Sequence, residues 1–453
     1  MVAKALAHVP GLFCGRRLVS LVNSPRRFFY LPAPVYFFSI LKILHTADWH
    51  LGQRFQHGHE RLAEHRCFLD WLLHTIEAEA VDVLVVAGDV FDTGNPPAAA
   101  RELYYSFLAR LKNSATCHDV VIVGGNHDSA ATLNASASLL KALRVHVVGG
   151  VPTNYLEQCI ALPHGAATPR LVVAAVPFLR DAEVRQLVAG ETAADREERL
   201  RHGIAAHYHA LADHLDHYRD QGVPVMATGH LFAAGGTAGD AERDIHVGTL
   251  GQITADAFPA CFDYVALGHL HRPQLVGGQA HIRYCGAPIP LSFSETSHPQ
   301  QVLLVTFNGA ACPAIQALEV PCTRLLRRFR GSLEKVVQEL LDHDNADYEH
   351  PTWAEVAVES GLPWALVQDQ VREAWQATEG RVQVLAVRKL REETAPAAAV
   401  YTHAAPLPDL DELTPRAVFE QLLDTKEYDP EARQELLDTF GELLAYQRAD
   451  ALV

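Results

Sequence analysis

Residues 120–128 read VVIVGGNHD, an aliphatic run that ends in two glycines followed by Asn126, His127 and Asp128. A short run of branched residues bounded by glycine predicts a strand that is buried on both faces, as in parallel sheets. The same pattern returns at 83–89, where VLVVA is followed by Gly88 and Asp89. Because α/β proteins carry their active sites in the loops beyond the strand ends, these polar residues are candidate site residues.

Similar strands, separated by helical patterns, are predicted along the first two thirds of the chain. The expected strands cover residues 42–46, 83–87, 120–123, 171–176, 225–228, 264–267 and 282–284. Apolar residues at helical spacing predict helices at 61–78, 97–112 and 194–219. Strands that alternate with helices in this way predict an α/β fold for a first domain at 41–319.

The segment before this domain differs from it in charge. Residues 1–40 contain five lysines and arginines and no aspartate or glutamate. A basic, acid-free and apolar leader resembles an organelle transit peptide. We interpret it instead as a misassigned start, because a buried strand begins near Leu41 and the true first residue is expected there.

The last third of the chain predicts a smaller unit and a tail. A β-α-β-α-β pattern without candidate metal ligands defines a small α/β capping domain at 320–392; its elements are expected at 323–330, 332–342, 353–359, 363–376 and 381–388. Residues 393–411 are rich in alanine and proline and predict a linker. Within 412–453, Thr414-Pro415 and Asp429-Pro430 are typical starts of two helices with apolar faces. Such faces would dock on a partner or pack on their own domain.

Composition limits the class of function. The net charge of -16 makes the chain a poor general binder of phosphate backbones, so a DNA substrate would need metal ions, a local basic strip or a partner. The eight cysteines form no CxxC pair, which argues against a zinc ribbon and predicts a reducing, cytoplasmic location. No apolar run reaches the ~18–20 residues that a membrane span needs.

Seven residues at or just beyond strand ends have side chains that bind metals. They are Asp48, His50, Asp89, Asn126, His230, His269 and His271. Oxygen and imidazole ligands without cysteine suit manganese, iron, zinc or magnesium rather than a structural thiolate site. Seven ligands are too many for one ion and suit two ions that share a carboxylate, the usual equipment for phosphate-ester hydrolysis. Each motif alone is compatible with an ordinary turn, but their conjunction predicts a two-metal site.

The motifs in their order also carry a resemblance. They are HTADWHLGQRF at 45–55, AGDVFDTGNPP at 87–97, GGNHDS at 124–129, ATGHL at 227–231, DIHVGTL at 244–250, ALGHLHRPQ at 266–274 and RYCGAPIPLSFSE at 283–295. The set resembles the calcineurin-like metallophosphoesterase superfamily and, more narrowly, the nuclease-subunit family of bacterial SbcCD complexes and related double-strand-break repair nucleases. The resemblance implies a four-layer α/β/β/α metallophosphoesterase domain with a small α/β capping domain and a C-terminal helical tail.

The resemblance also implies a role for each site residue. One ion would be held by Asp48, His50, Asp89 and His271, and the other by Asp89, Asn126, His230 and His269. The catalytic residues would be His127, which protonates the leaving oxygen or stabilises the charged phosphorane, and Asp128, which orients His127. Asp92 and Arg54 lie in matching loops and are candidates to contact substrate. The two ions are expected to be Mn²⁺, with Mg²⁺ as an alternative.

The implied activity is that of a manganese-dependent DNA nuclease in DNA repair, replication and recombination. The family is expected to act as a 3′→5′ exonuclease on double-stranded DNA and as an endonuclease on single strands and hairpins. Because the chain has no P-loop motif, ATP would be hydrolysed by another protein. The resemblance implies an SbcC-type ATPase whose coiled coil meets the C-terminal helices, with a homodimer of this chain inside a heterotetramer and no membrane.

Several alternatives stay open at this point. A small-molecule phosphodiesterase would use the same metal site, although it would not need a capping domain and tail. A scaffold with an idle metal site would not need His127. The arginines 324, 327, 328 and 330 would form a DNA-facing basic edge or only the polar face of a strand. The histidines 202, 207, 209, 214 and 217 would form a further metal site or, as we expect, a solvated helix face.

Overall fold

The computed structural model describes residues 40–390 with gaps at 57, 167, 185–190, 234–252 and 310–311, and eight positions in the tail, namely 419, 423, 433, 434, 436, 437, 439 and 440. The predicted leader, the predicted linker, the DIHVGTL motif and most of the predicted tail helices therefore lie outside the described residues. Residues 1–390 and 391–453 form two compact units.

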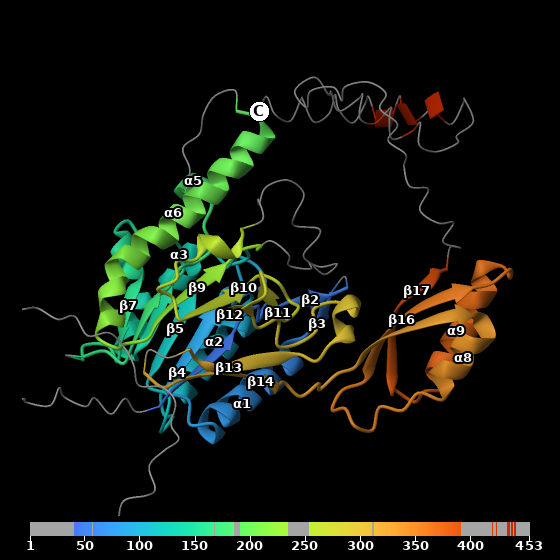
Figure 1. The fold of residues 1–453 in the computed structure, drawn as a ribbon. Helices are drawn as coiled ribbons and strands as arrows, with labels where there is room; N and C mark the ends of the chain where they lie inside the picture. Colours follow the sequence, from blue (N-terminus) through green and yellow to red (C-terminus); the bar gives the residue numbers. More distant parts are fainter. Residues whose placement is uncertain are drawn as a thin grey trace, which may run out of the picture. The chain divides into compact units, whose positions relative to one another are not determined.

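Two six-stranded sheets form the larger part of the first unit (Figure 1). In the first sheet β1, β4, β5 and β6 run parallel, β13 pairs antiparallel with β1, and β14 pairs antiparallel with β13. Its order is β14 (Ala314–Glu319), β13 (Gln301–Phe307), β1 (Leu41–Thr46), β4 (Val83–Ala87), β5 (Asp119–Val123) and β6 (Val145–Val148). The order of the second sheet is β11 (Gln274–Val276), β12 (Gln279–Tyr284), β10 (Tyr264–Gly268), β9 (Val225–His230), β8 (Leu171–Ala174) and β7 (Cys159–Leu162).

The alternation of side chains along each central strand builds separate cores on the two faces of a sheet. On β4, Leu84 and Val86 pack toward the helical layer that includes α1 (Leu62–Ala78) and α2 (Ala98–Leu111). Their neighbours Val83 and Val85 pack between the two sheets, together with residues of the second sheet. Every position of such a strand is buried, which explains its continuous apolar sequence.

The second sheet is covered on its outer face by α6 (Ala193–Asp220). On β8, Val172 and Ala174 contribute to this outer core, whereas Leu171 and Val173 face the first sheet. Helix, sheet, sheet and helix therefore form four layers, and the predicted α/β/β/α class is confirmed.

Seven strands and three helices predicted for this part are present, with small shifts at their ends. The sequence pattern did not predict β6, β7, β11, β13 or β14. Strands β7 and β14 lie at sheet edges and are only partly buried, so they lack a continuous apolar run. Strand β13 is mostly buried, but no polar ligand residue follows it to mark it as part of the site.

A third sheet consists of the parallel strands β15 (Leu326–Ser332), β16 (Thr352–Glu359) and β17 (Val382–Lys389). Helices α8 (Leu333–Leu341) and α9 (Trp364–Gln376) share its apolar core. The Ser332 side chain caps α8 by accepting the Lys335 N–H. We call residues 326–389 the cap module. The predicted boundary at 319/320 follows the end of β14, but it stays a prediction because residues 1–390 form one compact unit.

The cap module contacts the larger part through a cluster that we call the junction. Four buried apolar side chains form it, namely Phe55, Phe293, Leu326 and Trp353. Beside them, Glu64 on α1 pairs with Arg61 at 2.8 Å and with Arg324 at 3.3 Å. The Arg324 guanidinium also lies 4.2 Å from the centre of the Trp353 ring. Arg324 therefore belongs to the junction and not to a DNA-facing edge.

The positive charge of the predicted basic edge is partly neutralised by contacts on the cap module. Arg328 pairs with Glu355 at 2.7 Å, and the Arg327 guanidinium contacts His343 at 3.0 Å. Both arginines are nevertheless exposed on β15, as is Arg330.

The described tail residues pack on one another within the second unit. The rings of Phe419 and Phe440 are stacked with centroids 4.1 Å apart, and Leu423 and Leu437 are buried. Part of the apolar surface predicted for the tail is thus already covered. None of the described helices has the length and apolar composition of a membrane span.

The junction yields a prediction about stability. Replacing Glu64 by alanine would leave Arg61 and Arg324 without their shared carboxylate in a buried setting, so we expect a loss of about 3–5 kcal/mol in the free energy of unfolding. The matched control is Glu60→Ala, because Glu60 makes an exposed ion pair with Arg54 and should change stability by less than about 1 kcal/mol. Urea titration of both variants measures this, and equal losses would contradict the assignment.

Candidate metal centre

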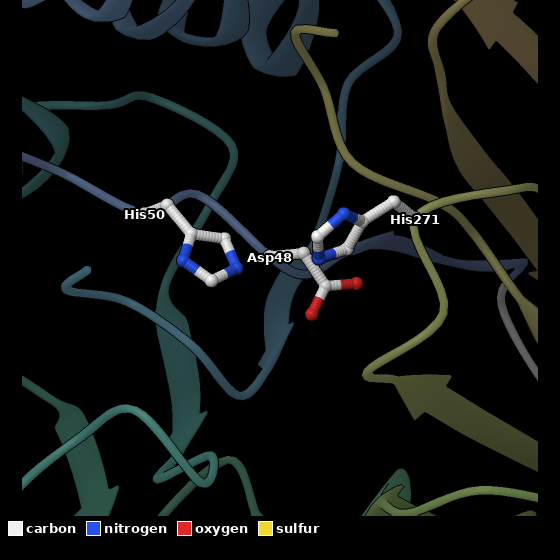
Figure 2. Close-up of side chains that lie close together, drawn as sticks. All are labelled: Asp48, His50 and His271. Carbon is white, nitrogen blue, oxygen red and sulfur yellow. The ribbon is translucent and has the colours of Figure 1, made fainter. Parts of the chain in front are cut away.

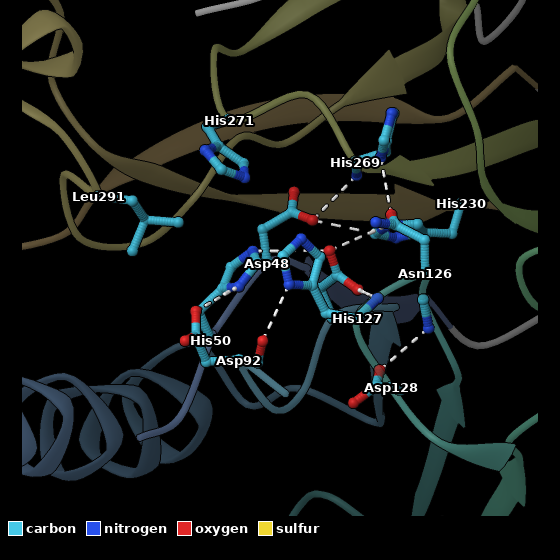
Figure 3. A network of polar contacts seen from close by, with 12 residues as sticks. Asp48, His50, Asp92, Asn126, His127, Asp128, His230, His269, His271 and Leu291 are labelled. Atoms are coloured by element: carbon cyan, nitrogen blue, oxygen red, sulfur yellow. Dashed lines mark hydrogen bonds and ion pairs between the residues drawn. The ribbon is translucent and has the colours of Figure 1, made fainter. Parts of the chain in front are cut away.

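All seven predicted ligands lie at one end of the two facing sheets, and Figure 3 labels each of them except Asp89. Asp48 and His50 follow β1, Asp89 follows β4, and Asn126 follows β5 in the first sheet. From the second sheet, His230 ends β9, and His269 and His271 follow β10. Parallel strands end at the same edge of a sheet, so residues that are far apart in sequence meet here.

One group of ligand atoms comes from Asp48, His50 and His271, and these atoms lie within 4.8 Å of one another (Figure 2). A second group at this spacing comes from Asp48, Asp89 and His230. The Asp89 carboxylate joins the two groups, because its Oδ2 lies 3.5 Å from His50 Nε2 and 3.2 Å from His230 Nε2. Asp89 therefore lies between the two groups, and its sharing by two ions stays a prediction.

Asn126 completes the second group. Its Oδ1 lies 2.9 Å from His230 Nε2 and 2.9 Å from His269 Nδ1. The amide oxygen and the two imidazoles therefore converge beside Asp89, as the sequence motif predicted.

The residues present fit divalent cations. Asp48 Oδ2 and His50 Nε2 are buried and make no hydrogen bond within the described part of the chain. Buried polar atoms in proteins nearly always have a partner, and two such atoms that face a cluster of other ligands indicate that the cluster binds a cation. The donor set of carboxylate, amide and imidazole groups suits Mn²⁺, Mg²⁺ or Zn²⁺.

The charges of these buried groups are strongly coupled. Burial alone would lower the pKa of His230, but the carboxylates of Asp89 and Asp48 outweigh it and raise this pKa to about 9. Burial raises the pKa of Asp48. Burial would also raise the pKa of Asp89, but the imidazoles of His230, His50 and His127 together hold it well below its usual range. The two carboxylates therefore favour a positive charge beside them, which a protonated imidazole or a cation can supply.

The backbone is specialised at the same place. Asp48, His50, Asp89 and His269 have positive φ angles of 54°, 45°, 49° and 99°. Left-handed backbone is rare for such residues and is typical of functional sites. Gly88, with φ of 94°, is required for a further reason, because a Cβ there would lie 2.2 Å from His230 Nδ1.

Three of the histidines predicted as metal ligands make a contact through Nδ1 that orients the ring. His271 Nδ1 lies 3.2 Å from Glu295 Oε1, and His50 Nδ1 lies 3.2 Å from Asp92 Oδ1. His230 Nδ1 donates to the Ala87 carbonyl at 2.9 Å. Such contacts leave Nε2 available to a metal and hold the ring in place.

The sequence did not predict the orienting contacts of Asp92 and Glu295. Asp92 stays a candidate to contact substrate, and its carboxylate also contacts His50, a predicted metal ligand. Glu295 was not predicted as a site residue. The only sequence signal for Glu295 is its place in the motif at 283–295. No pattern predicts its contact to His271, because the two residues are 24 positions apart.

His127 and Asp128 have separate tasks. His127 Nδ1 donates to the Asp92 carbonyl at 2.9 Å, which directs Nε2 away from this contact. The Asp128 carboxylate accepts the backbone N–H groups of Gly125, Val90 and Phe91 at 2.9–3.0 Å. The expectation that Asp128 orients His127 is therefore corrected: Asp128 ties the loop after β4 to the loop after β5, and a backbone carbonyl orients His127.

The remaining candidate groups lie outside this centre. Arg54 is exposed and pairs with Glu60. Among the described residues, the histidines of α6 form no group of three close ligand atoms. A separate group of Cys67, Glu349 and His350 does have that spacing. Its thiol lies 3.4 Å from Glu349 Oε2, and burial raises the thiol pKa to about 11, so this contact is satisfied as a hydrogen bond.

Comparison with known proteins gives two matching families. Residues 41–273 match the model of the calcineurin-like phosphoesterases, and residues 322–427 match the model described as the type 5 capsule protein repressor C-terminal domain. The first match covers all seven predicted ligands, and the second covers the cap module and part of the tail.

Relatives are similar over most of their length. The chain is 39% identical to the SbcD subunit of the SbcCD nuclease from Escherichia coli strain K12 over 406 residues, which is 89% of this chain and 98% of that protein. It is 36% identical to the corresponding SbcCD nuclease subunit of Rhodobacter capsulatus, over 84% of this chain and 93% of that protein. The corresponding protein of Bacillus subtilis is 35% identical over 58% of this chain and 66% of that protein.

The close approach at Gly88 can be tested directly. In Gly88→Ala the new Cβ would displace the His230 ring, and the left-handed backbone would cost roughly 1–2 kcal/mol in addition. We expect a lower melting temperature and a smaller rise of that temperature when Mn²⁺ is added, because the ligand set is distorted. Gly361→Ala is the control, since a Cβ there meets nothing within 4 Å. An unchanged response of Gly88→Ala to Mn²⁺ would contradict the geometry.

Proposed function

The chain belongs to the family of SbcD subunits of SbcCD nucleases, with a calcineurin-like phosphoesterase domain, and from this premise we propose how it acts and with what. It is a metal-dependent hydrolase of phosphate esters. Its substrate is DNA, which it cuts as the nuclease subunit of an SbcCD-type complex in repair, replication and recombination. The observation that carries the proposal is the set of predicted ligands around Asp48 Oδ2 and His50 Nε2. These two atoms are buried and make no hydrogen bond in the described structure, and His127 lies beside them.

Two divalent ions, which we propose to be Mn²⁺, would be held by the predicted residues. Asp48, His50, Asp89 and His271 would hold one ion, and Asp89, Asn126, His230 and His269 the other. When bound, such a pair neutralises the phosphate charge and lowers the pKa of the attacking water. Glu295 and Asp92 keep the rings of His271 and His50 in the orientation that this binding needs.

His127 is the residue proposed to act on the reacting phosphate. Because its Nδ1–H donates to the Asp92 carbonyl, its Nε2 is the nitrogen left to face substrate. Its ring lies against the His50 ring, with centroids 4.7 Å apart, and so borders the metal ligands. Nε2 would carry a proton and give it to the leaving sugar oxygen, or hydrogen-bond the charged phosphoryl oxygens.

The partners follow from the family and from charge. A chain with a net charge of -16 needs help to hold DNA. We propose that an SbcC-type ATPase supplies part of this binding and meets the C-terminal tail, and that the complex contains two copies of this chain. The exposed arginines 327, 328 and 330 on β15 would add a local basic surface. A cytoplasmic location is proposed because the seven cysteines in the described residues are all free thiols.

The role of His127 is tested with labelled duplex and hairpin DNA in the presence of Mn²⁺. We expect His127→Ala to lower the rate of cleavage about 10²–10⁴-fold, as loss of a general acid does, while Mn²⁺ binding is retained. The control is His118→Ala, because His118 is exposed and lies outside the centre. Each variant is assayed with and without the cognate ATPase and ATP, and ATP is expected to increase cleavage.

Two other outcomes have different meanings. Intact DNA in every reaction, with bis-p-nitrophenyl phosphate still hydrolysed, would move the assignment to a small-molecule phosphodiesterase. DNA cleavage that is equal in His127→Ala and wild type would refute the proposed role of this histidine.

A further inference from the structure

A short 3₁₀ turn, η3 (Phe293–Ser297), lies between the cap module and the metal centre. Phe293 and Glu295 are both buried on it, at 5% and 3% exposure. Residues two apart in a 3₁₀ helix point about 120° away from each other, so the two side chains address different neighbours.

On one side, Phe293 belongs to the junction. Its ring centroid lies 5.2 Å from that of Phe55, and the Phe55 ring in turn lies 5.3 Å from Trp353 of the cap module. The Arg328 guanidinium of β15 lies over the Phe293 ring at 5.7 Å. The cap module thus reaches Phe293 directly through Arg328 and by way of Phe55 through Trp353, within one buried cluster that also contains Leu326.

On the other side, Glu295 reaches the metal centre. Its Oε1 lies 3.2 Å from His271 Nδ1, and its carboxylate also accepts the Leu291 N–H at 2.8 Å and the Ser292 hydroxyl at 3.0 Å. These donors hold the carboxylate in a single position. A displacement of η3 would therefore carry Glu295, and with it the ring of His271, away from Asp48 and His50.

We propose that the cap module positions the metal ligand His271 through Phe293 and Glu295. The contact between the cap module and η3 would then set the affinity of the ion site formed by Asp48, His50 and His271. Glu295 is a positioning residue in this scheme. The inference rests on the proposed metal-dependent nuclease function and adds a means of control to it. Metal binding at the Asn126 side of the centre is expected to be independent of the cap module.

The test measures Mn²⁺ binding without DNA, by the electron paramagnetic resonance signal of free Mn²⁺. Glu295→Gln keeps the shape of the side chain and removes its charge, and we expect it to weaken one of the two sites about 10–100-fold. Trp353→Ala removes the cap face of the junction and is expected to weaken the same site by a smaller factor, on the order of 3–10-fold. The second site should keep its wild-type affinity in both variants.

The matched control is Trp364→Ala, because Trp364 packs against the core of the cap module and is not part of the junction. If Trp353→Ala does not fold, Leu326→Ala replaces it, since Leu326 is the other residue of the cap module in the junction. Wild-type Mn²⁺ affinity at both sites in a folded junction variant would overturn the proposal. Failure of the nuclease proposal would look different, because both Mn²⁺ sites would then respond as expected while DNA stays intact.

Discussion

The structure depends on one constraint: two sheets must end at the same edge so that Asp89 of the first sheet meets His230 of the second. The distance of 3.2 Å between Asp89 Oδ2 and His230 Nε2 joins strands β4 and β9, which belong to different sheets. This approach is possible because Gly88 lacks a side chain that would collide with His230. The apolar layer between the sheets sets the distance between them and therefore the distances between the site residues of the two sheets.

The same approach concentrates charge in a buried place. Asp48 and Asp89 are almost fully buried, and the ligand histidines around them are buried as well. Carboxylates in such a setting need a cation or protonated partners, and the carboxylates of Asp89 and Asp48 accordingly raise the pKa of His230. Metal binding would displace the proton from the imidazole, so the affinity for metal would depend on pH and bound metal would stabilise the fold.

Apolar strands alternating with helices predicted an α/β fold, and the resemblance to metallophosphoesterases implied the four layers. The seven predicted ligands meet in the structure because each lies at or just beyond a strand end, and their binding of metal stays a prediction. The sequence did not reveal what holds the ligands in orientation. Glu295 contacts His271 across 24 residues, and the Asp128 carboxylate bonds backbone groups that no sequence pattern marks. Strands β7 and β14 escaped prediction because edge strands are half exposed. The periodicity of apolar residues indicates which positions are buried, whereas the orientation of a side chain depends on contacts that form only when the chain folds.

The most direct test of the account is a crystal structure of the protein grown with Mn²⁺, with anomalous differences recorded at the manganese edge. The account predicts two peaks on either side of the Asp89 carboxylate. One would be bounded by Asp48, His50 and His271, and the other by Asn126, His230 and His269. A single peak, or peaks that lack Asp89 as a shared neighbour, would contradict the claim that the two sheets meet to build a two-metal centre.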